Sequence, residues 1–286
     1  MSRICWAMKN YNFAASNQWR HLALLALVLG SLIVVLLQAP IKQDLAYHHF
    51  IDTRNFFGIP NFYNVISNFP FFLTGIAGVL FCTRRASVDV RPEWLCFFAG
   101  ITLVSIGSAY YHFNPDNQSL VWDRLPMTMA FMGLFAALLG EFVDARLAKY
   151  GLLPMILLGL SSVLVWHWLD DLRFYVWVQF VPLLLIPVIL VLYRSRYTHS
   201  YLLIPVLILY VLAKMLEAFD AQLFSLFNSQ MSGHAIKHVF AALGSGIILW
   251  MLRARKINNT WGVPVSRRLQ IRIFLFVCDT RTLFLS

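Results

Sequence analysis

Charged residues are scarce in this chain. Only 13% of its 286 residues are Asp, Glu, Lys or Arg, whereas 59% are hydrophobic. Because soluble domains carry about a quarter charged residues, this composition excludes an ordinary soluble domain and indicates an integral membrane protein. The 24 Phe, 11 Tyr and 9 Trp fit that class, since aromatic side chains are enriched where helices meet the membrane–water interface.

Cysteine is rare as well, and no internal repeat is evident. The four cysteines have no paired spacing and no CxxC motif: Cys5, Cys82, Cys96 and Cys278. This pattern excludes a disulfide framework and a cysteine-based zinc site. The missing repeat disfavours the many transporter folds that are built from duplicated halves.

Long apolar runs fill most of the sequence. Eight of them are about as long as a helix that crosses a hydrocarbon core of ~30 Å, at residues 22–40, 62–83, 92–112, 120–143, 151–168, 174–193, 200–219 and 233–252. The first run has a longer apolar core than a signal peptide and a poor cleavage context after it, so we expect a retained helix. The sequence therefore predicts an all-α, polytopic membrane helix bundle.

The basic residues are sorted by loop. Most of the 23 Lys and Arg residues precede the first run, follow an even-numbered run or lie in the tail, and only Lys42, Arg54 and Arg173 lie in the opposite loops. The positive-inside rule then predicts that both termini are cytoplasmic. This sorting explains the formal charge of +10 without a nucleic-acid partner. Because no eukaryotic retrieval signal is visible at the C-terminus, we expect a bacterial inner membrane. A short apolar segment at 269–278 is expected to lie on the membrane surface.

Five polar residues reach a similar depth in this predicted orientation. Ser108 and His112 fall in the last, outer turns of the third run, and Asp123 falls in the first turn of the fourth. His234 and His238 fall in the outer turns of the eighth run. Ionisable groups inside a membrane are costly and usually functional. We therefore expect a site on the non-cytoplasmic side.

The histidines are candidate metal ligands. His234 and His238 are spaced i, i+4, so they share one helix face and can bind one metal together. An interfacial or hydrogen-bonding pair is the alternative for this spacing. With His112 they match the three-histidine set of a catalytic zinc site that leaves the fourth position open for water.

Asp123 and Ser108 are the candidate catalytic residues. Zinc lowers the pKa of a bound water to about 7, and a carboxylate such as Asp123 beside that water can pass its proton to a leaving group. An N-cap is the alternative role for Asp123. Ser108 is expected to hold the water or the oxyanion by a hydrogen bond, or else to ease helix packing as a small residue. A serine nucleophile is disfavoured, because no GxSxG motif is present.

These motifs together resemble a known family. Ser-x3-His (Ser108, His112), DRLPM (123–127) and His-x3-His (His234, His238) are similar to the alkaline ceramidases of the CREST superfamily of membrane hydrolases, and NFYNVISNFP (61–70) resembles the entry to that family's first core helix. The resemblance covers about residues 45–252.

The resemblance implies a fold, a reaction and a domain order. It implies a seven-helix core at 41–252, preceded by an extra transmembrane helix within 1–40 and followed by a basic cytoplasmic tail at 253–286. It also implies zinc on the three histidines and hydrolysis of the amide of ceramide-like membrane lipids to a sphingoid base and a fatty acid. The lipid is expected to enter laterally between helices.

The chain departs from the family at several positions. Eukaryotic members often have Glu where this chain has Arg124, and they bind calcium through an acidic segment ending in Glu, where this chain has Asn61. Calcium binding is therefore in doubt, and Asp52 and Asn61 are the candidate ligands of a second metal. His48 is assigned no role.

Two other functions stay open. One is a receptor-like or signalling member of the superfamily, in which the metal is structural. The other is a transporter whose pathway uses Lys214, Glu217 and Asp220, although Lys214 and Glu217 (i, i+3) can also form a simple ion pair.

Overall fold

The computed structural model describes residues 2–85 and 89–257, and within these ranges the chain is helical and forms no strand. Eight helical segments of the described chain are long and apolar enough to cross a membrane. The prediction of an all-α, multi-pass bundle is thereby confirmed. The helices are α1 (Ser2–Leu36), α2 (Phe62–Ile66), α3 (Phe69–Arg84), α4 (Arg91–Phe113), α5 (Asn117–Phe142), α6 (Ala145–Leu169), α7 (Arg173–Leu192), α8 (Leu203–Ala218), α9 (Asp220–Leu226) and α10 (Gly233–Ala254), with short 3-10 helices η1 (Leu45–His48) and η2 (Ser200–Leu202).

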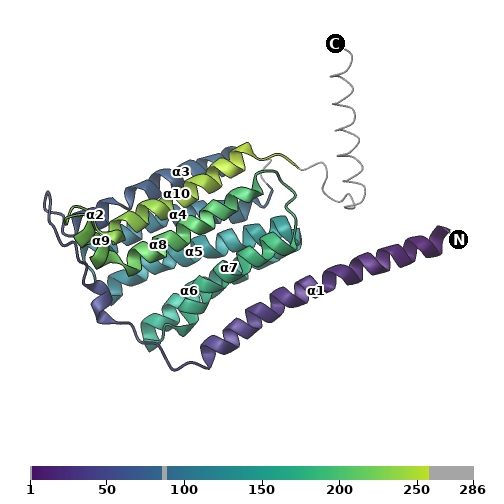
Figure 1. The fold of residues 1–286 in the computed structure, drawn as a ribbon, viewed down its shortest axis with the longest axis horizontal. Coiled ribbons are helices and arrows are strands. Elements are labelled where there is room, and N and C mark those ends of the chain that lie inside the picture. The colour runs from purple at the N-terminus through teal and green to yellow at the C-terminus, as the bar shows by residue number, and fades with distance from the viewer. Residues whose placement is uncertain (1, 86–88, 258–286) are drawn as a thin grey trace, which may run out of the picture.

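The long helices after α1 run alongside one another as a bundle, and α1 lies obliquely at its edge (Figure 1). Helix α1 is attached through α7, where the Trp177 indole donates a hydrogen bond to the Ser31 hydroxyl at 3.2 Å. This arrangement is the predicted seven-helix core with one extra N-terminal helix. The predicted tail segment at 269–278 lies outside the described residues.

The end of the first membrane helix differs from the prediction. The apolar run continues to Pro40, but α1 ends at Leu36. The guanidinium of Arg173 donates hydrogen bonds to the carbonyl oxygens of Leu36 and Gln38, at 3.0 and 2.7 Å. These bonds satisfy carbonyls at the helix end, and the residue before a proline disfavours helical backbone. The helix therefore ends earlier than hydropathy alone indicates.

Small residues let α4 approach its neighbours closely. A Cβ added at Gly100 would lie 2.7 Å from the backbone nitrogen of Ala130 in α5, and one at Gly133 would lie 2.7 Å from that of Phe97 in α4. Without a hydrophobic driving force between helices in lipid, such close packing is a main source of association. Helices α4 and α5 therefore form the central pair of the bundle, and they carry three of the five predicted site residues.

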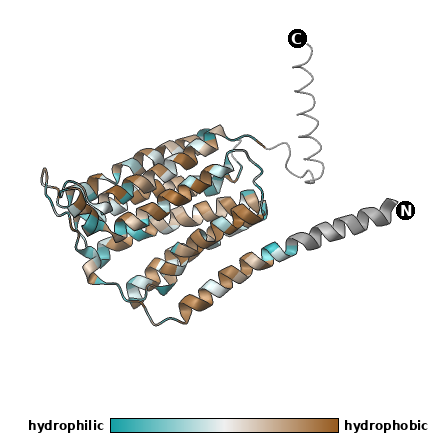
Figure 2. Ribbon diagram, in the orientation of Figure 1, coloured by the Kyte–Doolittle hydropathy of each residue, from teal (hydrophilic) through white to brown (hydrophobic). Residues whose placement is uncertain are grey.

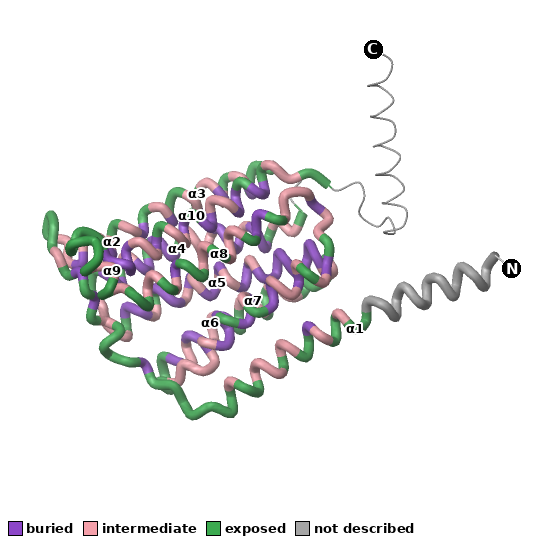
Figure 3. The backbone as a smooth tube through the Cα atoms, viewed as in Figure 1, coloured by how far each residue is buried: buried purple, intermediate pink, exposed green. Residues whose placement is uncertain are grey.

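The outer surface of the bundle is apolar. Hydrophobic residues cover the helices along their length (Figure 2), and buried residues lie on the inward-facing sides (Figure 3). Large apolar side chains such as Ile106, Leu157 and Val191 are exposed, at 60%, 56% and 83%. A surface of this kind is suited to lipid rather than to water.

Different elements lie at the two ends of the bundle. Helices α2 and α9 and the segment that follows α1 lie at one end, and the loops after α5 and α7 lie at the other (Figure 1). At that second end, the Glu141 carboxylate accepts hydrogen bonds from the Trp94 indole at 2.7 Å and from the Arg255 guanidinium at 2.5 Å. This contact anchors the end of α10 to α4 and α5.

Candidate metal centre

Two caps fix the first turn of α10, which carries two of the histidines. The Ser232 hydroxyl accepts from the backbone N–H of Ala235 at 3.1 Å, and the Asp220 carboxylate accepts from that of His234 at 2.8 Å. Burial raises the pKa of Asp220. A Cβ at Gly233 would lie 2.2 Å from the carbonyl oxygen of Leu216, so only glycine allows this close approach to α8.

The crossing of α4 and α5 brings the two candidate catalytic residues together. A Cβ at Gly107 would lie 1.9 Å from the carbonyl oxygen of Trp122. The helices therefore touch backbone to backbone at this point. Ser108 follows Gly107 in α4, and Asp123 follows Trp122 in α5. The side chains of Ser108 and Asp123 lie within hydrogen-bonding reach of each other.

The N-cap interpretation of Asp123 is wrong. Helix α5 begins at Asn117, and its N-cap is Asp116, whose carboxylate accepts from the backbone N–H of Ser119 at 2.6 Å. This hydrogen bond lowers the pKa of Asp116. Asp123 lies in the second turn of α5 and not in the first, which leaves its carboxylate free of a capping role.

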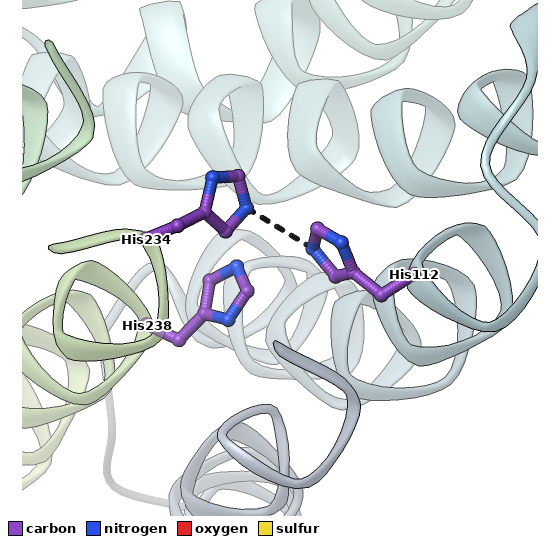
Figure 4. Close-up of side chains that lie close together, drawn as sticks. All are labelled: His112, His234 and His238. Atoms are coloured by element: carbon purple, nitrogen blue, oxygen red, sulfur yellow. Dashed lines mark hydrogen bonds between the residues drawn. The ribbon is translucent and has the colours of Figure 1, made fainter. Parts of the chain in front are cut away.

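The three histidines converge from α4 and α10 (Figure 4). One ring nitrogen from each of His112, His234 and His238 lies within 4.8 Å of the others, and all three side chains are buried. The Nε2 atoms of His112 and His234 are 3.3 Å apart. Two nitrogens at Zn–N distances in a tetrahedron are separated by about 3.3 Å. The donor set and this spacing fit a metal ion with three histidine ligands.

A hydrogen bond with Ser67 orients the ring of His238. The Ser67 hydroxyl donates to the carbonyl oxygen of Asn64 at 3.1 Å and lies 2.8 Å from Nδ1 of His238. With its proton on the Asn64 carbonyl oxygen, the hydroxyl can accept from Nδ1–H, which leaves the lone pair of Nε2 for a metal. A hydrogen bond of this kind orients the ring and raises the basicity of the ligand atom.

Aromatic rings enclose the histidines. The Phe50 ring lies 4.8 Å from the His112 ring and 4.9 Å from the His234 ring, measured between centroids. The Tyr111 ring lies 4.9 Å from that of His112. Both Phe50 and Tyr111 are buried. These contacts fix the planes of the histidine rings.

We expect Ser67→Ala to weaken zinc binding about 10- to 100-fold, because such partners of metal-ligating histidines contribute that much to affinity. The alanine removes the acceptor for Nδ1–H of His238 while leaving all three ligands in place. Chelator competition on the purified protein measures the change. Ser161→Ala is the matched control, since its hydroxyl bonds only to the Leu158 carbonyl oxygen of its own helix. Equal zinc affinities of wild type and Ser67→Ala would contradict the role of Ser67.

A cavity of about 340 Å³ opens beside the histidines. Its polar end is lined by Ser108, Asp123 and His238 together with Lys214, Glu217 and Lys237. The remainder is largely apolar and extends between the helices, with side chains from α4, α5, α7, α8 and α10 such as Phe97, Met127, Phe180, Val206 and Ile248. A polar end joined to an apolar chamber suits an amphiphilic ligand.

The charged residues on α8 are paired. Lys214 donates to Glu217 at 2.6 Å, which confirms the predicted ion pair. Lys237, from α10, donates to the other oxygen of the same carboxylate. The Tyr47 hydroxyl also donates to Glu217, at 3.2 Å. These contacts form a polar wall next to Asp123.

The proposed second metal site has other contacts. The carboxylate of Asp52 accepts two hydrogen bonds from the Arg54 guanidinium, at 2.8 and 2.7 Å, and this bonding raises the pKa of Arg54. The Asn61 side chain donates to the carbonyl oxygen of His112 at 2.9 Å. Among the described residues, only the three histidines form a group of three or more with metal-ligand spacing. A second metal at Asp52 and Asn61 stays a prediction that no described contact supports.

Sequence reasoning missed several residues around the histidines. Ser67 and Phe50 belong to distant segments, and no local pattern marks them. His48, to which no role was assigned, places its two ring nitrogens 3.0 Å from the Tyr111 hydroxyl and 2.9 Å from the side-chain oxygen of Asn117. It thereby ties the segment after α1 to the site. Its only sequence signal is its place in a polar loop on the predicted outer side.

Taken with the membrane helices, this geometry defines a multi-pass membrane protein with a buried three-histidine group that can hold a metal. A model of the ceramidase family matches residues 57–261, more than half of the sequence. The chain belongs to the ceramidase family. Membership supports a membrane enzyme that hydrolyses the amide of a ceramide-like lipid, and it confirms the resemblance seen in the motifs. A comparison with curated protein sequences found no match.

Proposed function

We propose that this chain is a zinc-dependent amidohydrolase that cleaves the N-acyl amide of ceramide-like lipids. The observation that carries the proposal is the position of Asp123 and Ser108 beside His238 at the polar end of an apolar cavity. The other two histidines lie against His238 with metal-ligand spacing. A metal, a proton acceptor and a lipid-compatible chamber are the three parts that such a reaction requires.

The three histidines would hold the metal through ring nitrogens. His112 and His234 would use Nε2, and His238 would use Nε2 because its Nδ1 is bonded to Ser67. When bound, zinc supplies Lewis-acid polarisation of the amide carbonyl and a water of lowered pKa. The carboxylate of Asp123 accepts a proton from the attacking water and returns it to the departing amine nitrogen. The Ser108 hydroxyl donates a hydrogen bond to the oxygen on which negative charge develops.

The lipid is proposed to reach the site from the bilayer. Phe180 of α7 lines the cavity and is 45% exposed, so the cavity meets the lipid-facing surface of α7. Across the cavity, the Gln179 amide donates to the Tyr210 hydroxyl of α8 at 3.2 Å. Acyl chains passing between α7 and α8 would stay in apolar surroundings while the amide reaches Asp123.

The orientation is part of the proposal. Both termini are proposed to be cytoplasmic and the site to face the non-cytoplasmic side, in a bacterial inner membrane. The support is the sorting of basic residues, since the Arg- and Lys-rich loops lie at the end of the bundle away from α2 and α9 (Figure 1). The division into an extra helix within 1–40, a core at 41–252 and a basic tail at 253–286 is proposed from the family resemblance.

The test is zinc content and turnover of the detergent-purified protein. We expect about one zinc per chain by elemental mass spectrometry, and release of fatty acid from short-chain ceramide that stops on chelation and returns with zinc. A folded protein that holds zinc without turnover would favour the receptor-like alternative. A folded protein without zinc would contradict the proposed site. The transporter alternative predicts flux in vesicles that depends on Glu217 and not on His234.

A further inference from the structure

Arg124 follows Asp123 but points to another side of α5. Its guanidinium carbon lies 4.0 Å from the ring centroid of Trp166 in α6 and 4.7 Å from that of Tyr175 in α7. One terminal nitrogen, Nη2, donates to the side-chain oxygen of Gln43 at 2.8 Å. The planar group is thus held in place by two rings and one amide.

This guanidinium is buried without a carboxylate partner. Arg124 is 7% exposed, and its Nη1 atom is buried with no hydrogen-bond partner. None of the ion pairs formed in the described part of the chain includes Arg124. A buried charge is costly unless it is paired, and the faces of Trp166 and Tyr175 offset only part of that cost. One donor of the guanidinium is therefore left without a partner in a dry place.

Arg124 belongs to the same cavity as the catalytic groups. Arg124 lines the cavity together with Asp123, Ser108 and His238. The other two cations of its polar end, Lys214 and Lys237, share one carboxylate, that of Glu217. Among its Lys, Arg, Asp and Glu residues, the lining thus holds three cations and the two carboxylates of Asp123 and Glu217. Arg124 is the cation among them that shares no carboxylate.

We infer that Arg124 binds an oxyanion on the head group of the lipid substrate. The inference rests on the proposed function and narrows its substrate class to N-acyl lipids with an acidic head group, such as a phosphate ester, close to the scissile amide. A guanidinium is suited to this role, because it is always charged and its fixed N–H groups match the geometry of oxyanions. The bound oxyanion would supply the charge partner that the protein does not provide.

Binding of two matched probes tests the inference. One probe is a short-chain ceramide, and the other is the same ceramide phosphorylated on its primary hydroxyl. Dissociation constants are measured in detergent for the zinc-loaded wild type, Arg124→Gln, Arg124→Lys and the control Lys42→Gln. Lys42 is exposed at the same end of the bundle and does not line the cavity, so the control removes the same formal charge.

We expect wild type and Lys42→Gln to bind the phosphorylated probe about 10- to 100-fold more tightly than the neutral probe, as one charged hydrogen-bonded contact provides. Arg124→Gln should bind the two probes equally, and Arg124→Lys should retain part of the preference. Equal binding of both probes by wild type, or an unchanged preference in Arg124→Gln, would overturn the inference. Preferential binding without turnover of either probe would support the anion site and contradict the proposed hydrolase.

Discussion

His234→Ala is expected to abolish both zinc binding and amide hydrolysis. The imidazole of His234 is one of three converging ring systems, and its Nε2 lies 3.3 Å from that of His112. Two remaining histidines fall short of the three protein ligands that catalytic zinc sites use. Zinc content should drop from about one per chain to near zero, and release of fatty acid from ceramide should fall to background. Elemental mass spectrometry and product analysis on the same preparation measure the two losses.

The matched control for this variant is His167→Ala. His167 is an exposed histidine of α6 and belongs to no metal-ligand group of the described residues. It should retain wild-type zinc and turnover. Both variants are compared by size-exclusion chromatography and thermal unfolding in detergent, so that misfolding is distinguished from ligand loss. Wild-type turnover by a folded His234→Ala protein would remove the three-histidine site from the mechanism.

Asp123→Asn is expected to lower kcat about 10²- to 10⁴-fold, which is the usual contribution of a positioned general acid–base group. Asparagine keeps the size of the side chain but cannot accept a proton. Zinc content should stay at the wild-type level, because Asp123 is not part of the three-histidine group. Steady-state kinetics and zinc analysis therefore distinguish the two variants: His234→Ala should lose zinc and activity, whereas Asp123→Asn should lose activity alone.

Asp44→Asn provides the comparison for Asp123→Asn. Asp44 is exposed at the same end of the bundle and caps η1 by accepting from the backbone N–H of Ala46, a role that asparagine also fills. We expect wild-type kcat for this control. If Asp123→Asn lost zinc in proportion to its activity, Asp123 would act by maintaining the site and not by moving a proton.

The helices were predictable because hydropathy is a local property of the chain. Each of the eight apolar runs corresponds to one of the segments able to span a membrane. The histidines were predictable for a related reason, since polar residues are conspicuous in an apolar sequence and His234 and His238 share the i, i+4 spacing of a helix face. The sequence placed His112 at the same depth as this pair, and the structure adds that α4 and α10 bring the three side chains together.

The rest of the site depends on contacts that no local pattern encodes. Ser67 and His238 are 171 residues apart, and nothing in their neighbourhoods links them. The alternative N-cap role of Asp123 was wrong because α5 begins at Asn117, before the apolar run that starts at residue 120, and Asp116 is its cap. Polar hydrogen bonds also ended α1 before its apolar run did, through Arg173. Hydropathy locates a helix but not the contacts that terminate it.

The division of the ligands between α4 and α10 has a consequence for biosynthesis. His112 is made early, whereas His234 and His238 belong to α10, the last helix that the structure describes. A nascent chain inserts its helices in order from the N-terminus. Until α10 has emerged from the ribosome and entered the bilayer, the growing polypeptide has only His112 of the three histidines of the proposed metal site. On the proposed mechanism, amide hydrolysis would thus begin only after α10 has joined the bundle.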